Sequence, residues 1–183
     1  MAGRIERAFR RVDHAELRIC RCLNRSADLG AINRFFRIVS WMGDGWVWYA
    51  LIATLPLLYG ARGIVPALHM TLTGAIAVAI YKSIKSRAVR ERPFVTHSVI
   101  QCASAPLDRY SFPSGHTLHA VSFTVVVVAY FPELGWPLSG LTTSIALSRV
   151  ILGLHYPTDV AAGAILGGAL GIASLTVGLG MVG

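Results

Sequence analysis

One histidine–aspartate pair in the second half of the chain has the spacing of a nucleophile with its orienting group. His155 and Asp159 are four residues apart, and Pro157 between them suits the first turn of a helix. On such a helix the Asp159 carboxylate can accept a hydrogen bond from one ring nitrogen of His155, which leaves the other nitrogen free to attack. A pair of this kind can also be purely structural, so its surroundings decide the interpretation.

A second segment, Pro113-Ser114-Gly115-His116, opens an apolar run and has the residue order of a helix start. The free backbone N–H groups of a first helical turn bind anions, and a glycine lets an oxyanion approach the backbone closely. His116 would then lie beside a bound phosphate, where it can transfer a proton. The alternative is that these residues only cap a helix.

Three cations complete the set of residues that can do chemistry. Lys85 and Arg92 are seven residues apart; if the helix before them continues, they lie about two turns apart on one face, and Pro93 ends it. Arg149 ends an apolar run, where a charge needs a functional reason. Cations of this kind can hold a phosphate. Near a membrane they can equally contact lipid headgroups.

The elements that must position these residues are expected to be membrane-spanning helices. Apolar residues make up 54% of the 183 residues and charged residues 14%, whereas soluble domains have roughly 45–50% and about 25%. Most apolar residues lie in five runs, each near the roughly 20 residues that span a bilayer: 38–59, 64–84, 114–131, 136–154 and 157–182. The expected fold is an all-α integral membrane protein with about five transmembrane helices. Gly163, Gly167 and Gly171, four residues apart, predict close helix packing.

The N-terminal region is basic. Nine of the 17 Lys and Arg residues fall in the first 37 positions, and the net charge is +8. Residues 4–25 have apolar side chains at helical spacing beside an arginine-rich face, which predicts a helix in the headgroup region rather than a signal peptide or a nucleic-acid-binding arm. The alternative is a solvated helix packed on the protein's own loops. The apolar residues of this face are Ile5, Phe9, Val12, Ile19 and Leu23.

The sequence predicts one domain over residues 1–183, with the basic helix in residues 1–30 and the catalytic segments in residues 85–159. If the five spans alternate, all three segments share one membrane face with the long polar connection 85–113, where a site is expected. The N-terminal arginines favour the cytoplasmic side of an inner membrane for that face. The three cysteines, Cys20, Cys22 and Cys102, are expected to be free thiols.

Taken together, the three segments resemble the signature of the type 2 phosphatidic acid phosphatase superfamily. Its first motif is matched by Lys85, six intervening residues and Arg92-Pro93, and its second by Pro113 to His116. Its third is matched by Ser148-Arg149, five residues, His155, three residues and Asp159. One motif alone is weak, but all three in order are highly specific. Many members of the family have six spans, with the first motif after the third, whereas two runs precede Lys85 here.

The resemblance implies a phosphatase that needs no metal and no cofactor. His155 would attack phosphorus and form a phosphohistidine, oriented by Asp159, while His116 would protonate the leaving oxygen and later activate water. The phosphoryl oxygens would be held by Lys85, Arg92, Ser114, the Gly115 N–H and Arg149. Secondary candidates near these motifs are Asp44, Asp108, Arg109 and His119, whereas His14, His69 and His97 match no motif.

The expected partners are the lipid bilayer and a membrane lipid phosphate, and no nucleic acid. The substrate would be of the phosphatidic acid, phosphatidylglycerol phosphate or undecaprenyl diphosphate type, because the site would lie where headgroups lie. Two alternatives stay open: a membrane phosphatase for a small soluble phosphate ester, and a non-catalytic lipid-binding protein. The sequence indicates neither the chain type of the lipid nor the oligomeric state.

Overall fold

The computed structural model describes the backbone of residues 2–179 and the side chains of residues 12–176. This part of the chain is all-helical, without a β-strand, as predicted. The α-helices are α1 (Ala2–Asn24), α2 (Gly30–Trp41), α3 (Val47–Tyr59), α4 (Ala61–Lys85), α5 (Pro93–Thr96), α6 (Gly115–Tyr130), α7 (Gly135–Ile151) and α8 (Pro157–Leu179). Short helical turns are η1 (Arg25–Asp28), η2 (Met42–Trp46) and η3 (Pro132–Leu134).

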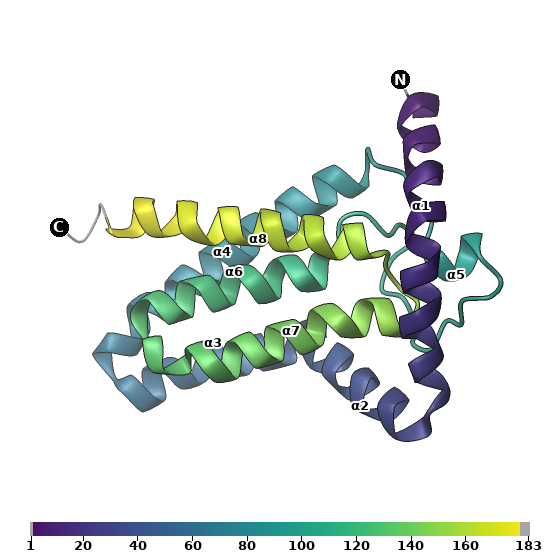
Figure 1. Cartoon of the computed structure of the whole chain (residues 1–183). Helices are drawn as coiled ribbons and strands as arrows, with labels where there is room; N and C mark the ends of the chain where they lie inside the picture. Colours follow the sequence, from purple (N-terminus) through teal and green to yellow (C-terminus); the bar gives the residue numbers. More distant parts are fainter. Residues whose placement is uncertain (1, 180–183) are drawn as a thin grey trace.

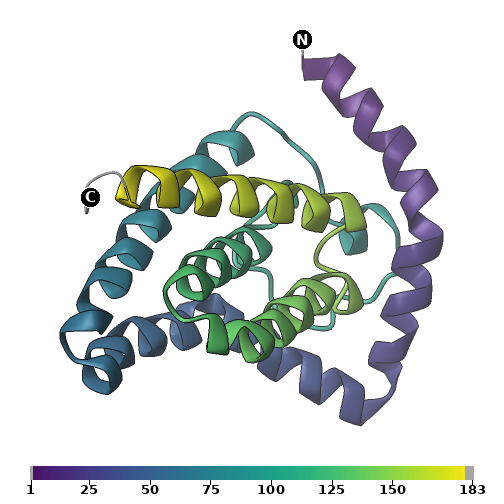
Figure 2. The same cartoon turned by 60° about the vertical axis from the view of Figure 1, so that its left-hand side comes forward.

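Five of the helices form a bundle around α6, which contacts α4, α7 and α8 (Figure 1). The α3 and α4 helices pack on each other along one side of it. At one end of the bundle, where α7 ends and α8 begins, α1 runs across the other helices (Figures 1 and 2). The loop that joins α4 to α6 lies at the same end (Figure 1). All three segments singled out in the sequence therefore meet at this end.

A row of glycines sets the distance between α6 and α8. A Cβ atom added at Gly163 or Gly167 would collide with the backbone carbonyl of Ser114 or Leu118 on α6, and one at Gly171 would press on Val125. This confirms the predicted packing seam. Side chains larger than hydrogen would push the two helices apart.

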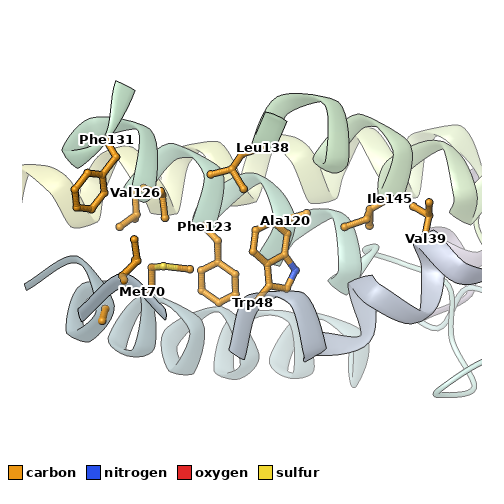
Figure 3. Close-up of a cluster of buried hydrophobic side chains, with 12 residues drawn as sticks. Val39, Trp48, Met70, Ala120, Phe123, Val126, Phe131, Leu138 and Ile145 are labelled. Atoms are coloured by element: carbon orange, nitrogen blue, oxygen red, sulfur yellow. The ribbon is translucent and has the colours of Figure 1, made fainter. Parts of the chain in front are cut away.

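The interior of the bundle is apolar. Trp48 of α3 packs its ring 5.4 Å from that of Phe123 on α6, beside Met70 of α4 (Figure 3). The outer surface is apolar as well: large side chains such as Leu57, Leu72 and Ile165 are exposed. A soluble monomer rarely exposes so many, and a lipid environment accounts for them.

Two helices are long and apolar enough to cross a membrane, within the described residues: Ala61–Lys85 and Pro157–Thr176. The other three predicted runs form shorter helices, with 13 residues in α3, 16 in α6 and 17 in α7. The first run is divided by a kink in η2, where Gly45 has a φ of 129°. The number of five transmembrane helices therefore stays a prediction. Residues 180–182 of the fifth predicted run lie outside the described part.

The α1 helix packs on α5, α7 and α8 and on the loop after α4. Its contact with a loop was part of the alternative interpretation, and its place in the headgroup region stays a prediction. Its inward side is mixed: Asp13, Glu16 and Asn24 are buried there, and Cys20 and Leu23 belong to an apolar cluster with Ile100 and Tyr156. Val12 and Ile19 of the predicted apolar stripe are exposed, which leaves them free to contact lipid headgroups. The side chains of Ile5 and Phe9 are not among those described.

Candidate active site

One cavity of about 800 Å³ gathers most of the residues that the sequence pointed to. It is lined by Lys85, Arg92, Gly115, His116, Arg149 and His155, together with residues of α3, α4 and the 107–110 segment. Ser114 and Asp159 do not line it. The secondary candidates Asp44, Asp108, Arg109 and His119 all do. The three sequence segments thus converge on a single space.

His155 lies in the turn between α7 and α8. Two features shape this turn: Gly153 has a φ of 75°, which favours glycine, and the Arg149 carbonyl accepts the N–H groups of Leu154 and His155, both at 3.0 Å. The Nε2 atom of His155 lies 3.3 Å from the Arg92 guanidinium. A guanidinium only donates, so Nε2 is the unprotonated nitrogen, whose lone pair accepts from Arg92. The ring proton then sits on Nδ1, which faces Asp159.

Asp159 does not make the predicted hydrogen bond to His155. Its Oδ2 atom is 3.6 Å from Nδ1, which is longer than a hydrogen bond. Instead, Oδ2 accepts the Tyr156 N–H at 2.8 Å, and Oδ1 accepts from Arg90. The carboxylate is fully buried and still directed at the histidine ring. Arg90 and the Tyr156 N–H thus occupy the two carboxylate oxygens in place of His155.

The environment keeps the His155 ring neutral. Burial is the largest cause, and the charges of Arg149, Arg92 and Lys85 act in the same direction, so the pKa of His155 lies well below 6.5. A neutral imidazole is the form that can attack an electrophile. At neutral pH the ring therefore has the state that nucleophilic chemistry requires.

The expected helix from Lys85 to Arg92 does not exist. The α4 helix ends at Lys85, and Arg92 is extended, with φ −80° and ψ 152°, because Pro93 follows it. The two cations meet through Asp108 instead. Lys85 Nζ donates to both Asp108 carboxylate oxygens, at 2.8 and 2.6 Å, and Arg92 donates to Oδ1 at 2.7 Å. Asp108 thus occupies the place expected for a phosphate.

Asp108 is ionised across the physiological range. Burial alone would raise the pKa of its carboxyl group, but the hydrogen bond and charge of Lys85, with the charge of Arg92, lower it below 3.8. Its side chain remains 40% exposed, which leaves it accessible to a competing anion from solvent.

The start of α6 combines a helix cap with a second histidine–carboxylate pair. Ser114 is buried and its hydroxyl accepts from the Thr117 N–H at 3.5 Å, so it caps the helix. His116 Nε2 lies 2.5 Å from Oδ1 of Asp44, which comes from the turn before α3. A carboxylate at this position stabilises the protonated imidazole. The sequence had suggested Asp44 only as a residue lining the pocket.

Arg149 has unused hydrogen-bonding capacity. Its side chain is 2% exposed and one terminal nitrogen donates to Ser40. Its Nε atom is buried and has no hydrogen-bond partner among the described residues. An unpaired buried donor is costly, and an anion in the adjoining cavity would satisfy it.

The opposite wall of the cavity is apolar. It is formed by side chains of α3 and α4, including Trp48, Ile52, Met70, Ala75 and Val78. A second cavity of about 860 Å³ shares Asp44 and Leu107 with the first, but none of the predicted catalytic or phosphate-binding residues lines it. Among the described residues, no group of three or more His, Cys, Asp or Glu side chains is arranged to hold a metal ion.

Sequence reasoning missed Arg90, which is 1% exposed and bonded to Asp159. The only sequence signal was its place between Lys85 and Arg92. Its partners Asp13 and Glu16 lie 77 and 74 residues away. Nothing in the spacing of those acids pointed to it.

Known proteins resemble this chain in sequence and in fold. The family model described as "PAP2 superfamily" matches residues 66–179. Undecaprenyl-diphosphatase BcrC of Bacillus subtilis is 33% identical over 113 residues, which cover 61% of this chain and 58% of that protein. Decaprenylphosphoryl-5-phosphoribose phosphatase of Mycobacterium tuberculosis is 35% identical over 74% of this chain and 73% of its own length. The crystal structure of Aquifex aeolicus LpxE superimposes with a TM-score of 0.72 at 24% identity, covering 88% of this chain and 95% of that one.

Proposed function

The chain belongs to the PAP2 superfamily, and from this premise we propose that it is a membrane lipid phosphatase. The observation that carries the proposal is the composition of one cavity: cations and three histidines, among them His116 and His155, with the apolar wall of α3 and α4 beside them. The charged end suits a phosphoryl group, and the apolar wall suits the chain of a lipid. The substrate is the terminal phosphate of a membrane lipid phosphate or diphosphate.

In the first step, Nε2 of His155 attacks phosphorus and the bond between phosphorus and the lipid oxygen breaks. His116 protonates the leaving oxygen, and Asp44 stabilises its imidazolium. Asp159 stabilises the positive charge that develops on the His155 ring. Lys85, Arg92, Arg149 and the Gly115 N–H hold the phosphoryl oxygens, since positioning and charge stabilisation dominate phosphoryl transfer.

In the second step, His116 takes a proton from water, and the resulting hydroxide attacks the phosphohistidine. The phosphorus–nitrogen bond breaks, inorganic phosphate forms and His155 returns to its neutral state. Ser114 supports this site by capping α6 with its hydroxyl rather than by touching the phosphate. No step requires a metal ion.

The assay that tests this proposal measures phosphate release by the detergent-purified protein, with a chelator present. The panel contains undecaprenyl diphosphate, phosphatidic acid, phosphatidylglycerol phosphate and a soluble sugar phosphate. Release from a lipid well above release from the sugar phosphate is expected. Preference for the sugar phosphate would support the soluble-ester alternative, and no release from a folded protein would support the lipid-binding alternative.

Asp44 is expected to act through His116. An Asp44→Asn variant keeps the shape of the side chain but not its charge. The kcat on a lipid phosphate should fall, but by less than the loss of about 10²–10⁴-fold that follows removal of a general acid. The KM should change little. Steady-state kinetics beside a Glu133→Gln control, which removes a carboxylate at the far end of the bundle, measure the effect. Equal kcat values for Asp44→Asn and Glu133→Gln would show that Asp44 does not act in the mechanism.

Asp108 is expected to compete with phosphate for Lys85 and Arg92. A partly exposed ion pair is worth up to about 1 kcal/mol, so Asp108→Asn should lower the inhibition constant of inorganic phosphate by about fivefold. Because the pKa of Asp108 lies below 3.8, the carboxylate stays charged and this ratio should be constant from about pH 5 to 9. Glu91→Gln serves as the control. Weaker phosphate inhibition in Asp108→Asn would mean that Asp108 aligns the two cations instead.

We propose a bacterial-type inner-membrane location with the catalytic end on the cytoplasmic side, which the N-terminal arginines favour. Two native thiols make this testable, because Cys22 and Cys102 are exposed near the catalytic end and Cys20 is buried. An impermeant maleimide should label inside-out vesicles and not intact spheroplasts. Labelling of intact spheroplasts would reverse the orientation.

A further inference from the structure

Arg90 joins three separate parts of the chain in one buried cluster. It lies in the loop after α4, and its guanidinium donates to Asp13 at 2.9 and 2.6 Å and to Glu16 at 2.9 Å, both on α1. It also donates to Thr158 at 2.8 Å and to Asp159, at the start of α8. Its Cζ atom lies 4.1 Å from the centre of the Tyr156 ring. A guanidinium held on every side cannot change its direction.

These contacts determine how Asp159 faces the histidine. Arg90 holds Oδ1, and the Tyr156 N–H holds Oδ2, which is the oxygen that lies 3.6 Å from Nδ1 of His155. Two different donors on two oxygens fix the plane of the carboxylate. A buried carboxylate without a cationic partner would take up a proton or turn toward another donor.

We propose that Arg90 is a positioning residue for the His155–Asp159 pair, and that Asp13 and Glu16 of α1 hold it in place. The inference rests on the proposed function, because Asp159 matters only if His155 is the nucleophile. Arg90 lies between Lys85 and Arg92, at a position that the first motif leaves unspecified. It also gives α1 a part in catalysis that its sequence did not suggest.

The charges in the cluster predict the direction in which each substitution should shift the pH dependence of kcat. One guanidinium faces three carboxylates, so Arg90 favours the ionised form of Asp159 and the two acids of α1 oppose it. The reaction needs Asp159 ionised. Protonation of Asp159 should therefore cause the fall of kcat at low pH, which is the acid limb of the pH profile. The titratable groups that face Asp159 are Asp13, Glu16 and Cys20 of α1, Lys85 at the end of α4, Arg90 of the loop and His155 of the turn.

The test compares the pH dependence of kcat in wild-type protein, Arg90→Gln and Arg90→Lys, on the lipid that the wild-type enzyme prefers. Arg90→Gln should lower kcat by about tenfold to a hundredfold at neutral pH, leave KM within about twofold, and move the acid limb up by on the order of one pH unit. Arg90→Lys should recover part of the shift. Arg87→Gln is the matched control, since Arg87 is an exposed arginine three residues earlier in the same loop, and it should behave as wild type.

Asp13→Asn supplies a second variant that keeps Arg90 in place. It removes a negative charge from the cluster, so the acid limb should move in the opposite direction, to lower pH, by a smaller amount. Variants that only loosen the fold would lose activity equally at every pH. Acid limbs that coincide with wild type in both Arg90→Gln and Asp13→Asn would overturn the proposal.

Inactivity of the wild-type chain on every lipid would defeat the proposed function and not this inference. In that case NMR of ¹⁵N-histidine-labelled protein measures the tautomer of His155 without turnover. Wild-type His155 should show the tautomer protonated on Nδ1, and Arg90→Gln should show a mixture of tautomers. An unchanged His155 signal in Arg90→Gln would overturn the inference on its own.

Discussion

Replacing His155 by alanine should abolish phosphate release, with kcat falling by on the order of 10⁴-fold or more. In the proposed mechanism the ring is the attacking group, and the remaining cations can bind a phosphoryl group without transferring it. Neutral His155, with Nε2 toward the cavity and Nδ1 toward Asp159, has the geometry of a nucleophile. Quenched turnover of a ³²P-labelled lipid should trap a base-stable, acid-labile phosphoenzyme in the wild-type protein and none in His155→Ala.

The matched control is His14→Ala, which removes an exposed histidine of α1 outside the cavity. It should retain wild-type turnover and phosphoenzyme. Thermal unfolding of both variants separates loss of chemistry from loss of fold. Wild-type turnover by a folded His155→Ala protein would refute the phosphohistidine mechanism.

Replacing His116 by asparagine should lower kcat on a lipid phosphate by about 10²–10⁴-fold, which is the contribution of a general acid. The size should depend on the leaving group. A lipid alkoxide needs the proton from His116, whereas p-nitrophenolate leaves without it. With p-nitrophenyl phosphate the variant should therefore release a burst of nitrophenolate equal to the enzyme concentration, followed by slow turnover.

The slow phase after the burst is expected because, in the proposed mechanism, His116 is also the base for hydrolysis of the phosphohistidine. Rapid-mixing absorbance measurements give both phases. His69→Asn is the control, because His69 pairs with Tyr130 on α6, outside the cavity. Equal losses for the lipid and for p-nitrophenyl phosphate in the first turnover would show that His116 does not protonate the leaving group.

The proximity of several site residues could be predicted from short spacings in the sequence, because local backbone geometry determines it. His155 and Asp159 are four positions apart, and the start of α8 brings the two side chains to one side, whatever surrounds it. The same holds for the cap at Ser114. The glycine seam of α8 was predictable because a 4-residue spacing defines one face of a helix.

The loop after α4 could not be predicted in the same way. Its shape depends on long-range backbone contacts, such as Ser111 N–H to the Arg90 carbonyl at 2.9 Å and Ala103 N–H to the Leu152 carbonyl at 3.1 Å. Those contacts place Asp108 on the two cations, and α1 supplies the acids around Arg90. Partners 70 or more residues apart, such as Asp44 and His116, leave no periodic signal in one sequence.

The contact between α6 and α8 has a consequence for anyone who engineers this protein. Exchanging a helical glycine for alanine is a standard way to raise melting temperature, because alanine favours the helix by about 1 kcal/mol. Here Gly163 lies against the carbonyl of Ser114, and the Ser114 N–H in turn donates to the Asp159 carbonyl at 3.0 Å. A methyl group at Gly163 would push the start of α6, which carries His116, away from the start of α8, which carries Asp159. Thermostabilised variants should therefore be sought on the lipid-facing side of α8, with its glycine face left untouched.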